Sequence, residues 1–165
     1  MYRTYIITAS DTASKGERED LSGPEIARIL EEFGGYEIVG SAVLSDDREE
    51  LSGEMKRVAD ERIADLILTT GGTGFSVRDN MPEATADACT RMVPGIAEAM
   101  RAYSMTKTPR GMLSRAASGI RAYTLIVNLP GSVKAVRECL ECILPALGHG
   151  IDILKGDAKM CGESE

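Results

Sequence analysis

Short apolar runs alternate along this chain with longer segments whose apolar residues recur at helical spacing. The clearest run, Leu66-Ile-Leu-Thr69, is apolar up to its last residue, as expected for a strand covered on both faces of a sheet. Similar β-prone runs occupy residues 5–9, 36–44 and 124–129. Strands separated by helical segments in this order indicate a doubly wound fold. The sequence therefore predicts a single α/β domain with a mostly parallel sheet and helices on both faces.

The helical segments begin with recognisable capping signals. Ser22 precedes Gly-Pro-Glu25, so Ser22 can cap a helix and Glu25 can complete a capping box. Asp47 with Glu50 opens the next helix, and Ser132 can cap the last one. The expected helices cover residues 22–33, 47–63, 82–89, 95–102, 112–117 and 133–147. We expect the domain to span residues 1–150 and residues 151–165 to form a loosely ordered tail.

The composition limits the partners that this chain can have. Its 165 residues suffice for one domain, and 19 Lys and Arg against 26 Asp and Glu leave a net charge of −7. That balance argues against a broad nucleic-acid or membrane-surface binder, whose affinity would rest on a basic face. Four cysteines are too few for a disulfide framework, and no apolar run approaches a membrane span. We therefore expect a cytoplasmic protein without nucleic-acid or membrane partners.

Four loops follow the expected strands, over residues 10–22, 45–47, 69–80 and 128–132. Ligands of open α/β sheets bind beyond the carboxyl ends of the strands, so these loops should cluster around a site. The densest signal is Thr69-Thr-Gly-Gly-Thr-Gly74, where three glycines permit positive φ and bring amides close to a phosphate. It is not a Walker loop, because no Gly-Lys-Ser/Thr follows, and it is not a Rossmann fingerprint, because Val77 occupies the third glycine position. A tight turn without a ligand explains the local pattern equally well.

Three carboxylates, on Asp46, Asp47 and Asp79, also lie just beyond expected strand ends. Mg²⁺ is held by one or two carboxylates together with substrate phosphates, so a pair of these residues could bind it. Asp47 is better explained as a helix cap. For Asp46 and Asp79, a metal site and a loop-bracing role both remain open.

Other features favour structural roles. Asn128-Leu-Pro-Gly-Ser132 could bind an anion at a helix N-terminus, although a capped helix is the better local explanation. Residues 101–121 carry five cations and no carboxylate, which suits either an anion-binding patch or, more often, a solvated face. Cys139 and Cys142 have metal spacing without a second pair and are better explained as core residues, and His149 lacks a partner motif for general-base work.

Seven short signatures, in one order and spacing, together resemble the MogA/MoaB family of molybdenum-cofactor biosynthesis. They are Ser10-Asp11, Ser22-Gly-Pro24, Thr69–Gly74 with Arg78-Asp79, Pro82-Glu-Ala-Thr85, Pro94-Gly95 with Glu98–Arg101, Leu113-Ser-Arg115 and Asn128–Ser132. The resemblance covers residues 3 to 150. It implies an α/β fold that assembles as a homotrimer and binds molybdopterin.

The resemblance also implies an activity. Active members are molybdopterin adenylyltransferases, which transfer AMP from Mg²⁺-ATP to the terminal phosphate of molybdopterin and release pyrophosphate. Their product passes to a molybdate-insertion protein, and tungsten replaces molybdenum in some organisms. The alternative is a MoaB-type paralogue that binds pterin or nucleotide with weak or no transferase activity. Because the substrate phosphate attacks directly, the lack of a catalytic His or Cys is expected.

Carried over residue by residue, the resemblance assigns a catalytic and Mg²⁺-binding role to Asp79 and Asp46. Asp46 follows Ser45, where the family commonly has proline, so its assignment rests on less of the motif than that of Asp79. The remaining implied site residues bind substrate or nucleotide: Ser10, Asp11, Gly71, Gly72, Thr73, Gly74, Arg78, Ser114, Arg115, Asn128, Pro130, Gly131 and Ser132. Val133 is a second departure, at a helix-start position where the family commonly has proline.

Overall fold

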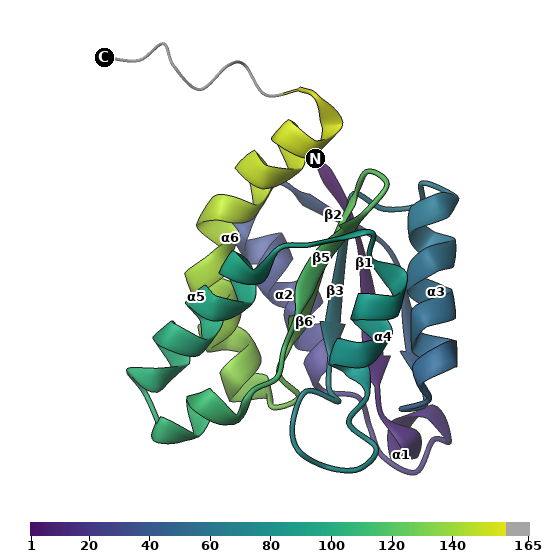
Figure 1. Ribbon diagram of the computed structural model, residues 1–165, viewed down its shortest axis with the longest axis vertical. Coiled ribbons are helices and arrows are strands. Elements are labelled where there is room, and N and C mark those ends of the chain that lie inside the picture. Colours follow the sequence, from purple (N-terminus) through teal and green to yellow (C-terminus); the bar gives the residue numbers. More distant parts are fainter. Residues whose placement is uncertain (158–165) are drawn as a thin grey trace.

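Six strands form one sheet in the order β2-β1-β3-β6-β5-β4 (Figure 1). The computed structural model describes residues 1–157. The strands are β1 (Tyr2–Ala9), β2 (Tyr36–Leu44), β3 (Leu66–Thr70), β4 (Arg91–Met92), β5 (Ser118–Arg121) and β6 (Thr124–Leu129). β2, β1, β3 and β6 are parallel, whereas β5 and β4 pair in antiparallel fashion. The predicted mostly parallel sheet is confirmed.

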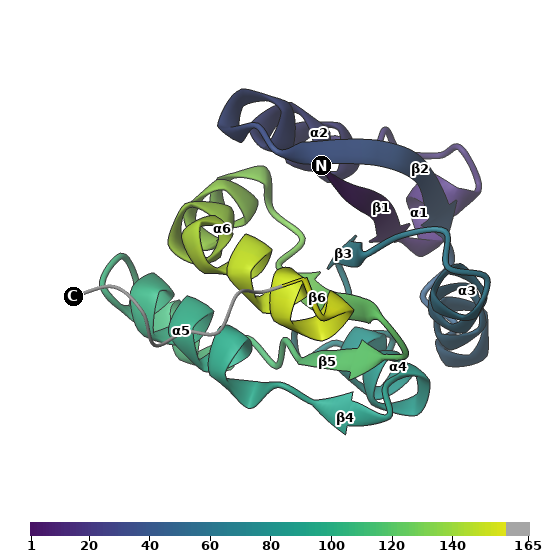
Figure 2. The ribbon, with the colours of Figure 1, turned by 90° about the horizontal axis from the view of Figure 1, so that it is seen from above.

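Helices cover both faces of this sheet. They are α1 (Asp11–Ser14), α2 (Ser22–Phe33), α3 (Arg48–Asp60), α4 (Met81–Ala88), α5 (Pro94–Met105) and α6 (Val133–Lys155), with a 3-10 helix, η1 (Pro109–Leu113), after α5. Figure 2 shows α2, α5 and α6 on one face and α3 and α4 on the other. Each face has its own apolar core, and β3 between them is buried along its whole length, as its continuous apolar run predicts.

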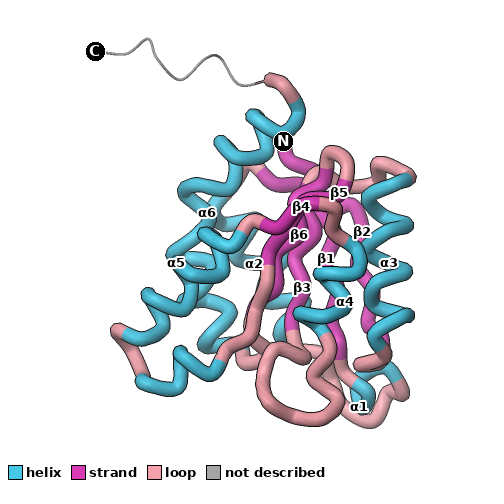
Figure 3. Tube along the Cα trace, viewed as in Figure 1, coloured by secondary structure: helices cyan, strands magenta, loops and turns pink. Residues whose placement is uncertain are grey.

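The register of the parallel strands aligns their carboxyl ends. Thr8 of β1 pairs with Thr70 of β3, and Thr70 pairs with Leu129 of β6. On the other side of β1, Ala9 pairs with Leu44, the last residue of β2. The loops that follow all four strands therefore emerge at one end of the molecule, where Figure 3 shows the longest loops gathered.

The antiparallel edge of the sheet was not predicted, because β4 and β5 are too short to show an alternating pattern. β5 contains Gly119, where a Cβ atom would lie 2.6 Å from Cys89 Sγ and 2.8 Å from the Arg91 carbonyl oxygen. Glycine thus permits the close approach of β4 to β5. The helix expected over residues 112–117 is also wrong: the 3-10 turn ends at Leu113 and the chain then enters β5 in extended form.

The last helix is longer than predicted: α6 continues past residue 150 to Lys155 and ends at Gly156 in the left-handed conformation. One glycine inside this helix, Gly148, has a packing role. A Cβ at Gly148 would lie 2.9 Å from the Tyr2 ring, and Ile151 beyond it is fully buried. The rest of the expected tail, residues 158–165, lies outside the described residues.

Two of the three expected helix caps are confirmed. Asp47 accepts a hydrogen bond from the Glu50 amide at 2.8 Å, and Ser132 accepts one from the Ala135 amide at 3.2 Å. The expected Ser22 cap is wrong. Ser22 is already inside α2, and its hydroxyl donates to the Gly131 carbonyl at 2.7 Å.

Candidate active site

The loops at the carboxyl end of the sheet are joined by polar contacts. The Ser10 amide donates to the Leu44 carbonyl at 2.9 Å, which links the ends of β1 and β2. The Thr70 hydroxyl donates to the Pro130 carbonyl at 2.7 Å, which links the ends of β3 and β6. The predicted clustering of the four loops is confirmed.

Two hollows lie on either side of the turn at residues 130–132. The first hollow, of about 480 Å³, is bounded by the β1 loop, the start of α2, Gly71 and Gly131–Val133. The second hollow, of about 240 Å³, lies between α5, η1 and α6 and is lined by Ser114 and Arg101, among others. Ser132 lines both. Among the predicted residues, the first hollow gathers Ser10, Gly71, Gly131 and Ser132, and the second gathers Ser114, Pro130 and Ser132.

The glycines of the β3 loop are required by its backbone. Gly71 and Gly72 have φ of +91° and +68°, values that side chains other than glycine rarely adopt. A Cβ at Gly71 would also lie 2.4 Å from the Ala9 carbonyl oxygen, so the loop packs directly against the end of β1. Gly71 forms part of the wall of the first hollow, where its backbone is accessible to a ligand.

The two predicted metal-binding carboxylates lie along this glycine loop. A Cβ at Gly72 would be 3.4 Å from Asp46 Oδ1, and one at Gly74 would be 2.9 Å from Asp79 Oδ2. Asp79 Oδ2 accepts a hydrogen bond from the Ser76 amide at 3.0 Å, which orients the carboxylate. Gly74 therefore provides space that the Asp79 carboxylate occupies, and a Cβ at Gly72 would lie within van der Waals contact of Asp46.

Asp46 is also bonded to the loop after β1. The Asp11 amide donates to Asp46 Oδ2 at 2.9 Å, and the Asp46 amide donates to Asp11 Oδ1 at 3.0 Å. Burial raises the pKa of Asp46, and the negative charges of Asp11 and Asp79 raise it further, against a lowering contribution from the Asp11 amide. A bound cation near Asp46 would relieve this repulsion.

These residues fit a magnesium ion better than a transition metal. Across residues 1–157, no group of three or more His, Cys, Asp or Glu side chains is arranged to hold a metal. Two carboxylates beside a glycine-rich loop match the usual coordination of Mg²⁺, which uses one or two carboxylates and completes its shell with water and substrate oxygens. Zn²⁺ sites in proteins have three or four protein ligands, which are mostly nitrogen or sulfur.

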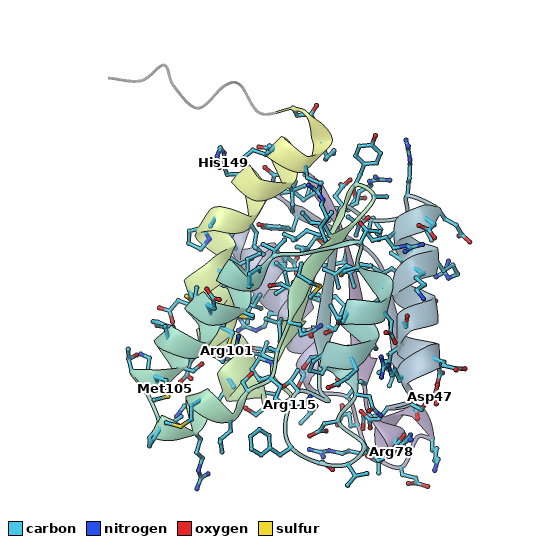
Figure 4. The ribbon with its side chains drawn as sticks, viewed as in Figure 1. Asp47, Arg78, Arg101, Met105, Arg115 and His149 are labelled. Atoms are coloured by element: carbon cyan, nitrogen blue, oxygen red, sulfur yellow. The ribbon has the colours of Figure 1, made fainter. Side chains whose placement is uncertain are left out.

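Arg78 connects the β3 loop to the β1 loop. Its Nε and Nη2 each donate to the Asp11 carboxylate at 2.9 Å, in a bidentate pair. The Arg78 guanidinium lowers the pKa of Asp11 to about 2, so Asp11 is ionised throughout the physiological range. Figure 4 shows Arg78 at this end of the molecule, beside α1. Asp11 thus braces the loops through both its amide and its carboxylate.

Asn128 is placed differently from the other predicted binding residues, because it is fully buried. Its side-chain amide donates to Thr69 Oγ1 at 3.0 Å and to Thr85 Oγ1 at 2.7 Å, and its Oδ1 accepts from the Ala117 amide at 3.0 Å. Asn128 therefore supports the site from within the sheet by joining β3, α4 and the segment before β5.

Asp20 is a site residue that the sequence reasoning missed. Its Oδ1 accepts from the amides of Ser22 and Gly23 at 3.1 and 3.0 Å, and its Oδ2 accepts from the Thr8 hydroxyl at 2.8 Å. Asp20 thus performs the capping role expected of Ser22, and it lines the first hollow. An acidic residue two positions before Ser22 is itself a capping signal, which could have identified it.

The basic stretch of residues 101–121 does not form a single patch. Arg101 donates to the Ala116 carbonyl at 2.8 Å, Lys107 lies over the Tyr103 ring, and Arg121 pairs with Asp60. Arg115 donates to the Gly74 and Asp79 carbonyls, both at 2.7 Å. Figure 4 shows Arg101 and Arg115 on separate elements. Cys139 is buried in the core and Cys142 packs against it, which confirms their predicted structural role.

Comparisons with known proteins agree with this geometry. A family model described as "Probable molybdopterin binding domain" matches residues 5–149. The chain is 42% identical over 164 residues to a molybdopterin adenylyltransferase of Helicobacter pylori strain J99, covering 96% of this chain and 90% of the relative. A molybdopterin adenylyltransferase of Haemophilus influenzae is 37% identical over 146 residues, covering 87% of this chain and 74% of the relative.

Solved structures show the same fold. The molybdopterin biosynthesis enzyme MoaB of Thermus thermophilus superposes with a TM-score of 0.89 at 42% identity, over 94% of this chain and 98% of that one. The tungsten cofactor synthesizing protein MoaB of Pyrococcus furiosus superposes with a TM-score of 0.81 at 34% identity, over 96% of this chain and 98% of that one.

Proposed function

Because this chain belongs to the family of probable molybdopterin-binding domains, we propose that the site at the carboxyl end of its sheet joins AMP to molybdopterin. The protein is a nucleotidyltransferase of molybdenum-cofactor biosynthesis, a molybdopterin adenylyltransferase, as the identity to enzymes of that name over nearly the whole chain supports. The observation that carries the proposal for the site is the pair Asp46 and Asp79, set along a glycine loop whose backbone borders a hollow.

The proposed reaction needs positioning more than it needs a protein nucleophile. An oxygen of the terminal phosphate of molybdopterin attacks the α-phosphorus of ATP, the α–β phosphoanhydride bond breaks, and pyrophosphate leaves. The barrier is lowered by holding the two anions in line and neutralising the charge that repels them. A bound Mg²⁺ supplies that neutralisation, and Asp46 and Asp79 would hold it.

The remaining residues divide between the two hollows. In the first hollow, Ser10, Gly71, Gly131 and Ser132 offer backbone and hydroxyl groups suited to the nucleotide phosphates. In the second hollow, Ser114 provides a hydroxyl on the side that the family resemblance connects with the pterin. Ser132, which lines both, would stand near the point where the two substrates meet.

Assembly and location are part of the same proposal. We propose a cytoplasmic homotrimer that passes its adenylylated product to a molybdate-insertion protein, with molybdenum or tungsten as the final metal. The structural relatives include both a molybdopterin and a tungsten cofactor protein. No helix within residues 1–157 is long and apolar enough to cross a membrane. Sedimentation velocity of the purified protein tests the trimer.

Incubation with molybdopterin, ATP and Mg²⁺ tests the activity. We expect pyrophosphate and adenylylated molybdopterin in equal amounts, and neither when Mg²⁺ is removed with a chelator. Tight molybdopterin binding without either product would contradict the proposal and favour the pterin-binding paralogue, which the identity to named adenylyltransferases does not favour.

A further inference from the structure

Arg115 makes four hydrogen bonds to one short segment of the chain. Its backbone amide donates to the Thr73 carbonyl at 2.8 Å, its Nε to the Gly74 carbonyl at 2.7 Å, and its Nη2 to the Asp79 carbonyl at 2.7 Å. Its Nη1 donates to the carboxylate of Glu83, in the first turn of α4. One guanidinium therefore holds both ends of the loop between Gly74 and Asp79.

That loop has little other support. Phe75 and Val77 are 72% and 95% exposed, so the segment contributes almost nothing to either apolar core. Its internal bonds are short-range, between Ser76 and Asp79. Apart from the ion pair of Arg78 with Asp11, the bonds from Arg115 to the two carbonyls are the main contacts that tie this loop to the rest of the fold.

Glu83 is the counterion that keeps the guanidinium in place. The hydrogen bond from Arg115 lowers the pKa of Glu83, so the carboxylate is ionised at neutral pH. Its Oε2 is buried and accepts no hydrogen bond from the described residues, so the carboxylate depends on Arg115 for its stabilisation.

Arg115 lies outside the residues that line either hollow. Three of its five N–H donors are already engaged with the loop and Glu83. Two donors remain, but a substrate phosphate that bound the guanidinium through its Nε would have to compete with the Gly74 carbonyl.

We propose that Arg115, with Glu83 as its counterion, is a positioning residue that sets the place of Asp79 by clamping the loop from Gly74 to Asp79. This inference rests on the proposed function for the role of Asp79, whereas the clamp itself rests on the observed contacts alone. It differs from the role implied by the family resemblance, in which Arg115 binds substrate.

Amide hydrogen exchange of the substrate-free protein tests the clamp independently of catalysis. We expect Arg115→Ala to speed exchange at residues 74–79 by at least about 10-fold, because the loop loses both carbonyl contacts. Arg121→Ala is the matched control. Arg121 also joins a carboxylate, Asp60, to a backbone carbonyl, that of Ala88, but it does so at the far end of α4. Unchanged exchange at residues 74–79 in Arg115→Ala would overturn the clamp.

Kinetics separate positioning from direct substrate binding. We expect Arg115→Ala to lower kcat by about 100-fold while both KM values change by less than about 3-fold, since a small displacement of a catalytic group costs that much. Arg115→Lys should recover only part of the rate, because an ammonium cannot reach both carbonyls in the fork geometry of a guanidinium. A selective rise in one KM with kcat retained would instead show that Arg115 contacts that substrate.

Glu83→Gln tests the same proposal while the Arg115 guanidinium stays in the protein. If Arg115 positions the loop, losing its counterion should lower kcat by a smaller factor and speed loop exchange in the same direction. If Arg115 binds substrate, freeing it from Glu83 should leave kcat unchanged, and that result would overturn the proposal. Should the wild-type protein form no product, the proposed function fails, while the exchange measurement still decides whether the clamp exists.

Discussion

At the end of the sheet where β1, β3 and β6 finish, Arg115 and Asp20 bind the backbone of loops, whereas at the opposite end the buried Asp65 binds two cations. Arg115 holds two loop carbonyls and Asp20 holds two loop amides at the first end. At the second, Asp65 is 3% exposed and pairs with Arg3 at 3.0 Å and Lys155 at 3.5 Å. Charged side chains thus hold loops in place at one end and form ion pairs with a buried carboxylate at the other.

The two ends of the sheet also differ in how far neighbouring charges neutralise their carboxylates. Asp65 is surrounded by cations, and although burial by itself raises its pKa, the hydrogen bonds from Arg3 and the charges of Arg3 and Lys155 outweigh it, so the pKa is lowered. The pKa of Asp46, at the loop end, is raised by burial and by two neighbouring carboxylates. The loop end therefore keeps negative charge that a cation can neutralise, whereas the charge of Asp65 is already neutralised by Arg3 and Lys155. Substitutions at the two ends should separate activity from stability.

The largest effect should come from Asp79→Asn. The amide keeps the size of the side chain and can still meet the Ser76 amide, but it loses the charge proposed to hold Mg²⁺. We expect turnover to fall by about 1,000-fold or more with little change in the thermal midpoint. Pyrophosphate release and thermal unfolding, measured together, check this, and near-normal turnover would remove Asp79 from the proposed metal site.

At the loop end, Gly71→Ala should lower both the activity and the stability of the protein. The new methyl would sit 2.4 Å from the Ala9 carbonyl, on a residue with φ of +91°, so we expect a loss of about 2–4 kcal/mol in the free energy of unfolding and a marked loss of activity.

Gly35→Ala is the control for backbone strain. Its φ is +85°, with nothing within 4 Å of the added methyl, and the cost should be about 1 kcal/mol without loss of activity. Urea unfolding of both variants measures the difference, and equal costs would show that the contact with β1 is unimportant.

Asp65→Asn should affect stability alone, since Asp65 lies at the end opposite to the site. We expect a loss of about 1–3 kcal/mol, because the contacts with Arg3 lose their charge assistance. The folded-state pKa of Asp65 is lowered, so its contribution is present above the ordinary aspartate value and is lost as pH falls below about 4.

The variant should therefore show a flatter loss of stability with acid than the wild type. Unfolding free energies measured between pH 3 and pH 7, with KM values at neutral pH, test this. A raised KM for either substrate would break the proposed separation of the two ends.

The smallest effect should come from Val133→Pro at the start of α6. Ser132, the preceding residue, has φ of −84° and ψ of 140°, which a following proline accepts, and its cap to Ala135 does not involve the residue 133 amide. We expect a gain of about 0.4–1 kcal/mol in stability and unchanged kcat. Thermal unfolding checks the gain, and a destabilised variant would show that the turn beside the first hollow is more constrained than its dihedral angles indicate.

Much of the architecture could be predicted from local pattern. The continuous apolar run of β3 and the capping chemistry of Asp47 and Ser132 are local signals, and the structure confirms them. β4 and β5 escaped prediction because they are too short to show an alternating pattern, and their pairing depends on the close approach of Gly119 to Cys89 and Arg91. The end of α6 escaped it because Gly148, a helix breaker by propensity, packs against Tyr2, 146 positions away in the chain.

The sequence by itself determined the layered fold, the loops that form the site and the family, since each depends on residue type, order and spacing. Only the tertiary structure decided what individual side chains do there. In the structure Asn128 lies inside the sheet, Asp20 caps α2, and Arg115 binds the loop that carries Asp79. The physical reason is that a polar side chain binds buried backbone groups that have no other partner. Which backbone groups are buried and unpartnered is decided only when distant segments pack together.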